Sequence, residues 1–186
     1  MTTNGRGPLR KHTIIALVED RPGVLNRIVS KWRQRGFNIE SLTVGHSETR
    51  GLSRMTFVVD ANTDAEQVVK QLDKLVDVVD IRDISAEEMV AREMALIKVA
   101  ADASNRSQII EIADIFKAEI VDVSRDAIIL EVTGDEEKID AIFELLQDFG
   151  VIELVRTGRV AVIKGSAASH PPPEEHYERY PGGELW

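Results

Sequence analysis

The sequence predicts an α+β protein built from two copies of one β-α-β-β-α-β pattern. Short runs rich in β-branched residues alternate with segments whose apolar residues recur every three or four positions, as strands and amphipathic helices require. This order occurs twice within 186 residues, which is enough chain for two small domains with separate cores. A β-α-β-β-α-β order is typical of a ferredoxin-like domain, in which two helices cover one face of an antiparallel sheet.

In the first half, we expect strands at 12–18, 37–44, 52–60 and 76–84. The first helix begins after Gly23 and ends before Gly36, and its apolar face is predicted to contain Val24, Leu25, Ile28, Val29 and Trp32. Apolar and polar residues alternate along 52–60, which predicts a strand buried on one face only. Thr63 and Glu66 have the spacing of a capping box, so a second helix begins there.

The second half repeats the order after a polar segment, 85–93, which we expect to be a short helical connector. Thr157 and Gly158 predict a hairpin between strands at 151–156 and 159–164, which adds one strand to this half. Asp135 is expected to cap the last helix. The other expected elements are strands at 95–101, 120–124 and 128–132, and helices around 109–116 and 135–149.

These elements divide the chain into two ferredoxin-like domains at 11–85 and 95–165, joined by a linker at 86–94. The remaining residues, 166–186, are rich in proline and glycine and contain few residues that could join a core, so disorder is expected. Three aromatic residues of this tail could instead anchor a partner: Tyr177, Tyr180 and Trp186.

Composition excludes several classes of function. The formal net charge is −9, which argues against a nucleic-acid backbone as the main partner because phosphate binding requires a basic face. No apolar run approaches the length of about 20 residues needed to cross a membrane. The chain has no cysteine, which excludes disulfides and thiolate chemistry. The N-terminal segment lacks the apolar region of a signal peptide, and a cytoplasmic protein is expected.

A search for catalytic or metal-binding residues finds little. The four histidines lack carboxylate or histidine neighbours at metal-ligand spacing, and no Ser-His-Asp arrangement can be proposed. Two groups of neighbouring acidic residues, one beginning at Glu87 and the other at 135–137, lie at expected helix starts, where negative charge stabilises a helix. No glycine-rich nucleotide motif is present. We therefore expect no catalytic residues, no metal site and no cofactor site in this chain.

The segment between the first strand and the first helix contains Pro22 and Gly23. Proline suits the first position of a helix, and glycine lets another molecule approach the backbone closely. The first turn of a helix carries unpaired N–H groups that can bind a carboxylate, while Asp20 just upstream could receive an ammonium group. The segment therefore has the parts of an amino-acid site, although an ordinary structural turn explains it equally well.

Several segments resemble a known family. Val18–Leu25 is similar to the opening signature of ACT domains, small modules that bind amino acids at dimer interfaces. Arg35–Val44, Leu52–Thr56, Gln71–Val79 and Arg92–Val99 resemble the regulatory small subunit of acetolactate (acetohydroxyacid) synthase. The resemblance covers roughly 11–164 and implies two ACT-like domains, a homodimer, and docking on a catalytic large subunit. That large subunit would hold thiamine diphosphate, magnesium and FAD and convert pyruvate into 2-acetolactate, and the small subunit would activate it and mediate feedback inhibition by valine or another branched-chain amino acid.

The same resemblance implies an effector site formed by the turn of one chain and the start of the second strand of its neighbour. Amides near Gly23 would hold the ligand carboxylate, and Asp20 with Asn38 would receive the ammonium. The implied site comprises Asp20, Arg21, Pro22, Gly23, Val24, Leu25, Asn38 and Ile39. If Gly23 has an ordinary backbone conformation, Gly23→Asp should abolish sensing without harming the fold.

Two other functions fit the same residues. One is a stand-alone amino-acid sensor or transcriptional co-regulator built from paired ACT domains, which would bind a ligand but no synthase. The other is a small enzyme on a ferredoxin-like scaffold, which the poor inventory of acid and base residues disfavours. Co-purification with a synthase large subunit would separate the first alternative from the small-subunit function.

Overall fold

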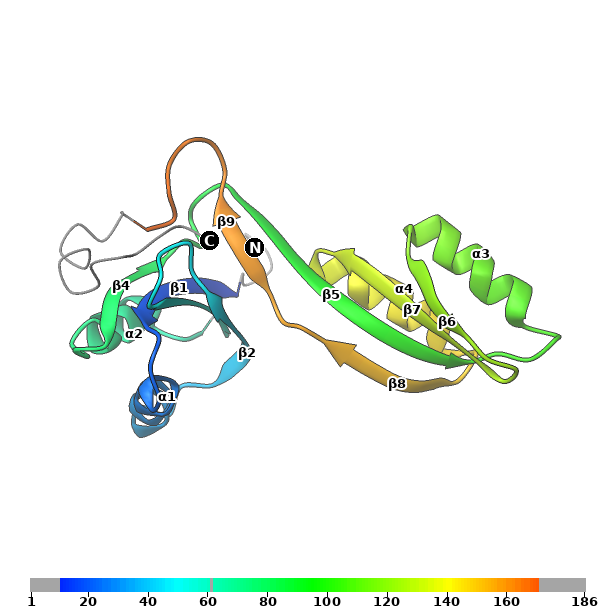
Figure 1. Ribbon diagram of the computed structural model, residues 1–186, viewed down its shortest axis with the longest axis horizontal. Helices are drawn as coiled ribbons and strands as arrows, with labels where there is room; N and C mark the ends of the chain where they lie inside the picture. Colours follow the sequence, from blue (N-terminus) through cyan, green and yellow to red (C-terminus); the bar gives the residue numbers. More distant parts are fainter. Residues whose placement is uncertain (1–10, 61, 171–186) are drawn as a thin grey trace, which may run out of the picture. The chain divides into compact units, whose positions relative to one another are not determined.

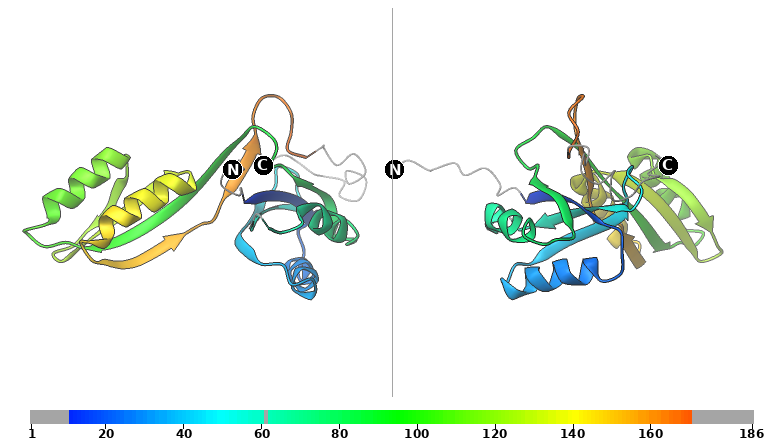
Figure 2. Two further views of the ribbon diagram at one scale, coloured as in Figure 1. Left: turned by 180° about the vertical axis from the view of Figure 1, so that it is seen from behind. Right: turned by 60° about the vertical axis from the view of Figure 1, so that its left-hand side comes forward.

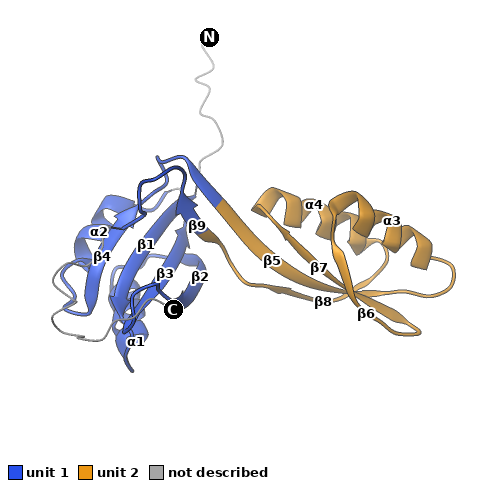
Figure 3. Ribbon diagram, turned by 45° about the horizontal axis from the view of Figure 1, so that its top comes forward, with its two compact units in different colours: residues 1–90, 161–186 blue, residues 91–160 orange. Residues whose placement is uncertain are grey.

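The computed structural model describes residues 11–60 and 62–170, which form two compact units (Figure 3). Unit 1 contains the chain up to Val90 together with the segment that begins at Ala161, and unit 2 is Ala91–Val160. The two units have the same order of elements, as the sequence predicts.

Unit 1 is a four-stranded antiparallel sheet covered on one face by two helices (Figure 1). Its strands lie in the order β2-β3-β1-β4, so β1 and β3 are central and β2 and β4 form the edges. This is the predicted ferredoxin-like arrangement. Its elements are β1 (His12–Glu19), α1 (Val24–Gln34), β2 (Ile39–His46), β3 (Leu52–Val59), α2 (Ala65–Leu72) and β4 (Val78–Asp83).

The core of unit 1 lies between the helices and the sheet. Val24, Ile28 and Trp32 recur every four residues on α1 and are each no more than 2% exposed, and the Trp32 ring stacks on Phe57 of β3 with centroids 4.6 Å apart. Leu25 and Val29 were predicted to share this face but lie outside it, 43% and 37% exposed. The buried stripe of α1 is thus narrower than its apolar residues suggested.

The second face of this sheet is covered too. All the residues of β3 are buried or half-buried, so the prediction of one exposed face was wrong. Arg54 shows why, because its guanidinium donates to the Ala161 carbonyl oxygen at 2.7 Å, from a segment more than 100 residues further along the chain. Burial lowers the pKa of Arg54. Sequence alternation could not reveal this cover, because it comes from the distant return of the chain.

Unit 2 repeats the topology with strand order β6-β7-β5-β8 and with α3 and α4 on one face (Figures 1 and 2). Its core lies between these helices and the central strands and is almost entirely aliphatic. Its elements are β5 (Met89–Ala100), α3 (Arg106–Phe116), β6 (Glu119–Val123), β7 (Ala127–Gly134), α4 (Glu136–Gln147) and β8 (Val151–Arg156).

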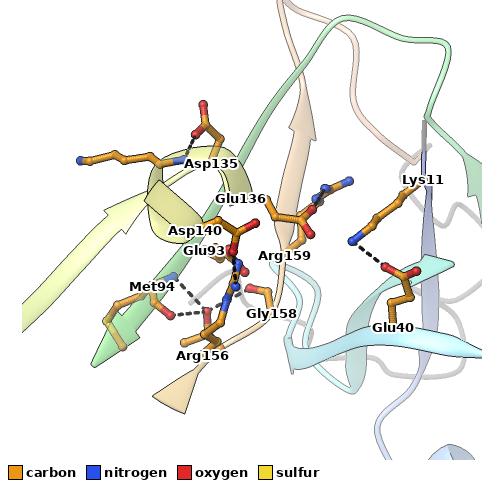
Figure 4. Close-up of polar contacts among 12 residues, drawn as sticks. Lys11, Glu40, Glu93, Met94, Asp135, Glu136, Asp140, Arg156, Gly158 and Arg159 are labelled. Carbon is orange, nitrogen blue, oxygen red and sulfur yellow. Dashed lines mark hydrogen bonds and ion pairs between the residues drawn. The ribbon is translucent and has the colours of Figure 1, made fainter. Parts of the chain in front are cut away.

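Arg156, the last residue of β8, joins three elements of unit 2 (Figure 4). Its guanidinium forms an ion pair with Glu93 of β5, which is 8% exposed, and donates to Asp140 of α4 at 2.6 Å. Just beyond β8, Arg159 forms an ion pair with Glu136 of α4 at 2.8 Å. These contacts hold the end of β8 against both the sheet and the helix.

The structure corrects two predictions about the connections. Met89–Glu93 is the first part of β5 rather than a helical connector, because these residues pair with the returning chain. The predicted hairpin at Thr157 is also wrong, because β8 and β9 (Val160–Ile163) both pair with β5 instead of with each other. The Thr157 amide donates to the Met94 carbonyl at 3.0 Å and the Lys164 amide to the Glu88 carbonyl at 2.8 Å.

The boundaries of the expected tail and of one helix cap also differ. Ser169 and His170 lie in the segment predicted to be disordered, yet they are only 6% and 4% exposed. The Ser169 hydroxyl accepts from the Ile163 amide at 3.1 Å. Residues 171–186, with the three aromatic candidates, lie outside the described residues. The cap of α2 is Asp64, one residue after the predicted Thr63, whereas Asp135 caps α4 as predicted.

Candidate functional site

The β1–α1 turn connects the buried end of a central strand to the start of a helix. Gly23 is the N-cap of α1 and adopts a left-handed conformation with φ of 88°. Residues with a Cβ adopt this conformation at an energetic cost, so glycine is needed here. Pro22 precedes the N-cap and does not occupy the first helical position that the sequence suggested. Its fixed φ restrains the approach to the turn instead.

The start of α1 is open. Gly23 supplies no side-chain cap. Among the described residues, no acceptor is found for the backbone N–H groups of Leu25 and Asn26. Such a helix end carries a partial positive charge, and its N–H groups are suited to a carboxylate.

Asp20 lies three residues before the N-cap of this helix. Its backbone N–H donates to the Gly51 carbonyl at 2.8 Å, which fixes the residue against the β2–β3 turn. Its carboxylate lies 3.0 Å from Nδ1 of His46, at the end of β2, and its side chain is 41% exposed. The carboxylate is therefore positioned by the fold yet open to solvent, as an ammonium acceptor must be.

Behind the turn lies a cluster of charged residues, two of which the sequence analysis missed. The Asp77 carboxylate is only 2% exposed and receives hydrogen bonds from Arg27 Nε at 2.5 Å, Arg27 Nη2 at 2.8 Å and Arg21 Nη2 at 2.9 Å. Arg21 also forms an ion pair with Glu19, which is a second buried carboxylate. The Arg27 and Arg21 hydrogen bonds hold the pKa of Asp77 below its ordinary value, although burial opposes them.

This cluster ties the turn to the loop between α2 and β4. The Glu19 amide donates to the Asp77 carbonyl at 2.9 Å, in addition to the side-chain contacts. Buried charges require partners, so the turn is held in one position. Sequence alone offered two weak signs of this: Asp77 is an acidic residue within an apolar run, and Arg27 lies one helical turn after Gly23.

Arg27 also faces the open helix start. A Cβ placed on Gly23 would lie 3.3 Å from Arg27 Nη1, the guanidinium nitrogen that does not contact Asp77. A full positive charge therefore lies beside the unpaired helix amides. The sequence-based expectation for Gly23→Asp fails on this geometry, because the left-handed backbone would be strained by any side chain.

The other two predicted site residues lie at the opposite end of the sheet. Ile39 and His12 both pair with Val59, whereas the turn follows Glu19, which pairs with Leu52. An eight-residue strand separates these two ends, which is about 25 Å at 3.2–3.4 Å per residue. One chain therefore does not bring Asn38 and Ile39 to the turn. A site containing all these residues requires a second chain.

The apolar residues predicted to line the site have different positions. Val24 is 2% exposed and belongs to the core of unit 1. Leu25 points outward from the same helix turn and is available to a ligand. Ile39 is partly buried against the core. Only Leu25 and Ile39 can therefore contact a ligand side chain directly.

Other kinds of site were sought in the part of the chain that the structure describes. No group of three or more histidine or acidic residues is arranged to hold a metal ion there. No helix within the same residues is long and apolar enough to cross a membrane.

Together, the fold and the open turn are those of a regulatory domain of the ACT class. Residues 14–80 match the model of the AHAS small subunit-like ACT domain, and residues 92–165 match that of the small subunit of acetolactate synthase. The chain belongs to the family of acetolactate synthase small subunits. These are regulatory subunits and not catalytic ones.

Individual relatives agree. The chain is 52% identical over 157 residues to a probable acetolactate synthase small subunit of Archaeoglobus fulgidus, covering 84% of this chain and 98% of that one. It is 48% identical over 158 residues to the acetolactate synthase small subunit of Bacillus subtilis, covering 84% and 92%. The crystal structure of the small subunit from Thermotoga maritima matches with a TM-score of 0.78 and 41% identity, covering 85% of this chain and 99% of that chain.

Proposed function

We propose that this chain activates the catalytic large subunit of acetolactate synthase and makes it sensitive to feedback inhibition by valine or another branched-chain amino acid. The open start of α1 carries the proposal, because it places unpaired amides and Arg27 next to the exposed carboxylate of Asp20. A zwitterion needs an anion acceptor and a cation acceptor within a few ångströms of each other.

Each part of the effector has a matching group. The carboxylate would accept from the amides of Leu25 and Asn26 and lie near Arg27, where a charge-assisted hydrogen bond is short and strong. The ammonium would donate to Asp20. An aliphatic side chain would contact Leu25.

The rest of the site would come from a second copy of the chain. β2 is an edge strand of the described sheet, and strands at this position of a sheet can pair with a strand of another chain. Symmetric antiparallel pairing of two β2 strands would put the start of one beside the end of the other. Asn38 of the partner subunit would then lie near His46, which contacts Asp20. A C₂ dimer contains two such sites.

The catalytic chemistry is assigned to the large subunit, which would hold thiamine diphosphate, magnesium and FAD. Membership in the small-subunit family argues against a stand-alone sensor, since a small subunit needs a large one. Effector binding at the turn would be transmitted through the Asp77 cluster to the α2–β4 loop, whose Val76 is 79% exposed. We propose this loop as one route from the effector site to the catalytic partner.

Reconstitution tests the proposed function. Synthase activity of the cognate large subunit is measured with and without this chain, while valine, leucine and isoleucine are titrated separately. We expect activation by the chain and inhibition by at least one of the three amino acids. Unchanged activity at saturating chain would contradict the role as an activator, and activation without any effector response would contradict the sensing role.

Complementation tests whether the site is shared between two chains. Asp20→Ala and Asn38→Ala homodimers should each bind the effector weakly, because both of their sites lack a group. A heterodimer of the two variants has one site with both groups intact, so mixing and refolding should restore binding to about a quarter of the wild-type sites. Absence of restoration, or a monomer in sedimentation at micromolar concentration, would contradict the shared site.

A further inference from the structure

Ser169 and His170, which follow β9, are buried in unit 1 although they belong to the end of the chain. The Ser169 hydroxyl accepts from the Ile163 amide, so this end folds back onto the last strand. Both residues lie beyond 92–165, the part of the chain that matches the small-subunit model. A polar ring that is 4% exposed, as that of His170 is, needs a hydrogen-bond partner inside the protein.

His170 finds such a partner in the β2–β3 turn, residues 47–51. Its ring Nε2 lies 3.1 Å from Oε1 of Glu48. The turn is closed by hydrogen bonds of its own, because the Ser47 hydroxyl donates to the Thr49 carbonyl at 3.0 Å and accepts from the Thr49 amide at 3.1 Å. A contact at Glu48 therefore restrains the turn as a whole.

The same turn fixes Asp20 from two sides. Its last residue, Gly51, accepts the hydrogen bond of the Asp20 amide at 2.8 Å. His46, which directly precedes the turn, places Nδ1 3.0 Å from the Asp20 carboxylate. The chain of contacts from His170 to Asp20 thus has two steps, one from the C-terminal segment to the turn and one from the turn to Asp20.

We propose that His170 is a positioning residue of the effector site, which acts on Asp20 through the β2–β3 turn. The inference rests on the proposed function, because it takes Asp20 as the acceptor of the effector ammonium. When the contact with Glu48 is lost, the turn gains freedom, and Asp20 must be ordered again each time an effector binds. Such ordering costs affinity. The C-terminal segment therefore changes the affinity for an effector that it does not touch.

Amide hydrogen exchange of the full chain, without any effector, tests the positioning by itself. In His170→Ala, the Asp20 amide should exchange at least fivefold faster, because its acceptor belongs to the loosened turn. The neighbouring Glu19 amide donates to the Asp77 carbonyl in the α2–β4 loop, so its exchange should not change. This difference between adjacent amides separates positioning from a general loss of stability.

Matched variants identify the contact that acts. His12→Ala removes a histidine–carboxylate contact of 2.9 Å with Asp83 at the opposite end of β1, so the Asp20 amide should exchange as in the wild type. His170→Gln carries an amide nitrogen at about the place of Nε2 and should restore slow exchange. His170→Asn is shorter and should behave like His170→Ala.

Calorimetric titration with valine, leucine and isoleucine relates the positioning to binding. His170→Ala and Glu48→Ala should each weaken about fivefold the binding of the amino acid that the wild type binds. The double variant should be no weaker than either single one, because both remove the same contact. If the wild type binds none of the three amino acids, the proposed function is overturned and the effector role of His170 with it, while the exchange rates still decide whether His170 holds Asp20.

Three results would overturn the positioning itself. The first is an Asp20 amide that exchanges equally fast in His170→Ala and the wild type. The second is a Glu19 amide that speeds up as much as that of Asp20. The third is a double variant in which the two losses of affinity multiply, since His170 and Glu48 would then act separately.

Discussion

The β1–α1 turn of unit 1 and the β5–α3 turn of unit 2 occupy equivalent places in the same topology, yet their side chains contact the backbone of the turn differently. In unit 2, the Asp102 carboxylate accepts from the amides of Ser104 at 2.7 Å and Asn105 at 3.2 Å. It also accepts from the Ser104 hydroxyl at 2.5 Å. In unit 1, the glycine N-cap leaves the amides open.

The comparison shows how one fold can carry an open or a closed turn at the same place. In unit 2, a carboxylate of the chain itself binds amides of the turn that leads into α3, whereas the turn of unit 1 has no such contact among the described residues. Hydrogen bonds from Ser104 hold the pKa of Asp102 below its ordinary value, so the carboxylate stays charged at neutral pH. Arg106 further closes this turn by donating to the carbonyls of Ala101, Ser124 and Arg125. Of these two turns, the one in unit 1 is therefore where we place the proposed effector.

Reversing the charge beside the open turn should have the largest effect. In Asp20→Lys, the ligand ammonium would meet a positive charge at about 4 Å, where the interaction is roughly 4 kcal/mol at an effective dielectric near 20. We expect valine affinity to fall at least a hundredfold in calorimetric titration. Because Asp20 is 41% exposed, the melting temperature should change little. Unaltered valine affinity would place the effector elsewhere.

The second-largest effect is expected for Asp77→Asn, which should lower the stability of unit 1. The substitution removes the charge that pairs Arg27 and Arg21, and breaking a buried ion pair costs about 3–5 kcal/mol. We expect the lower end, about 3 kcal/mol in the free energy of unfolding by urea, because both arginines are about half exposed and can be hydrated. Unit 2 offers a control in Asp140→Asn, whose carboxylate is 57% exposed and should cost less than 1 kcal/mol.

The ion pairs of Asp77 should also make the free energy of unfolding depend on pH, in a direction that the pKa of Asp77 determines. The pKa of Asp77 is lower in the folded than in the unfolded chain, where an aspartate titrates near 3.9. The contribution of the charged Asp77 carboxylate to the free energy of unfolding is therefore fully present above about pH 5, and it is lost as the pH falls through the folded-state pKa. Urea unfolding between pH 7 and pH 3 should show the gap between wild type and Asp77→Asn narrowing below about pH 4. A gap that stays constant down to pH 3 would contradict this account.

In the β5–α3 turn, Asp102→Ala should lower the melting temperature slightly, because it removes the hydrogen bonds that the Asp102 carboxylate accepts from Ser104 and Asn105. Its effect on the valine response of the reconstituted synthase should be nil, in contrast to Asp20→Lys. The inhibition curve of the variant is the measurement. If Asp102→Ala shifted the curve as far as substitutions at Asp20, the two turns would share one function and the contrast between them would fail.

The smallest effect is expected from shortening the C-terminal segment, which belongs to unit 1 and not to unit 2. Unit 1 includes the late segment with Ser169 and His170, whereas unit 2 comes from one continuous stretch. Removing 171–186 should leave folding unchanged. Removing 166–186 also deletes the bond from Ile163 to Ser169 and the contact of His170 with Glu48, and should cost about 1 kcal/mol. Equal melting temperatures for the two truncations would contradict a structural role for these residues.

Local patterns in the sequence were enough to predict much of this fold. The order of helices and strands, the cap at Asp135 and the strand at Val151–Arg156 follow from propensity and periodicity, which act over a few residues. The strand at Met89 and the burial of both faces of β3 were missed, because both depend on pairing with a segment about 70 or more residues away.

For a similar reason, local patterns indicated some residues of the candidate site and missed others. Asp20 and Gly23 are visible as a turn motif, and their proximity is guaranteed by the chain. Asn38 came from the family resemblance alone, since nothing local connects it with a turn at the other end of the sheet. Arg27 and Asp77 were missed, because a buried ion pair between residues 50 positions apart has no sequence period.

The insertion of unit 2 between two segments of unit 1 has a consequence for synthesis on the ribosome. Unit 1 cannot take up β9 and Ser169 until the whole of Ala91–Val160 has been translated. Until then, the sheet face that Arg54 shares with Ala161 lacks its cover. Domains that emerge whole can fold as they are made. Here the nascent chain can finish the inserted unit before the first one, so unit 1 is the last to mature although its first strand leaves the exit tunnel first.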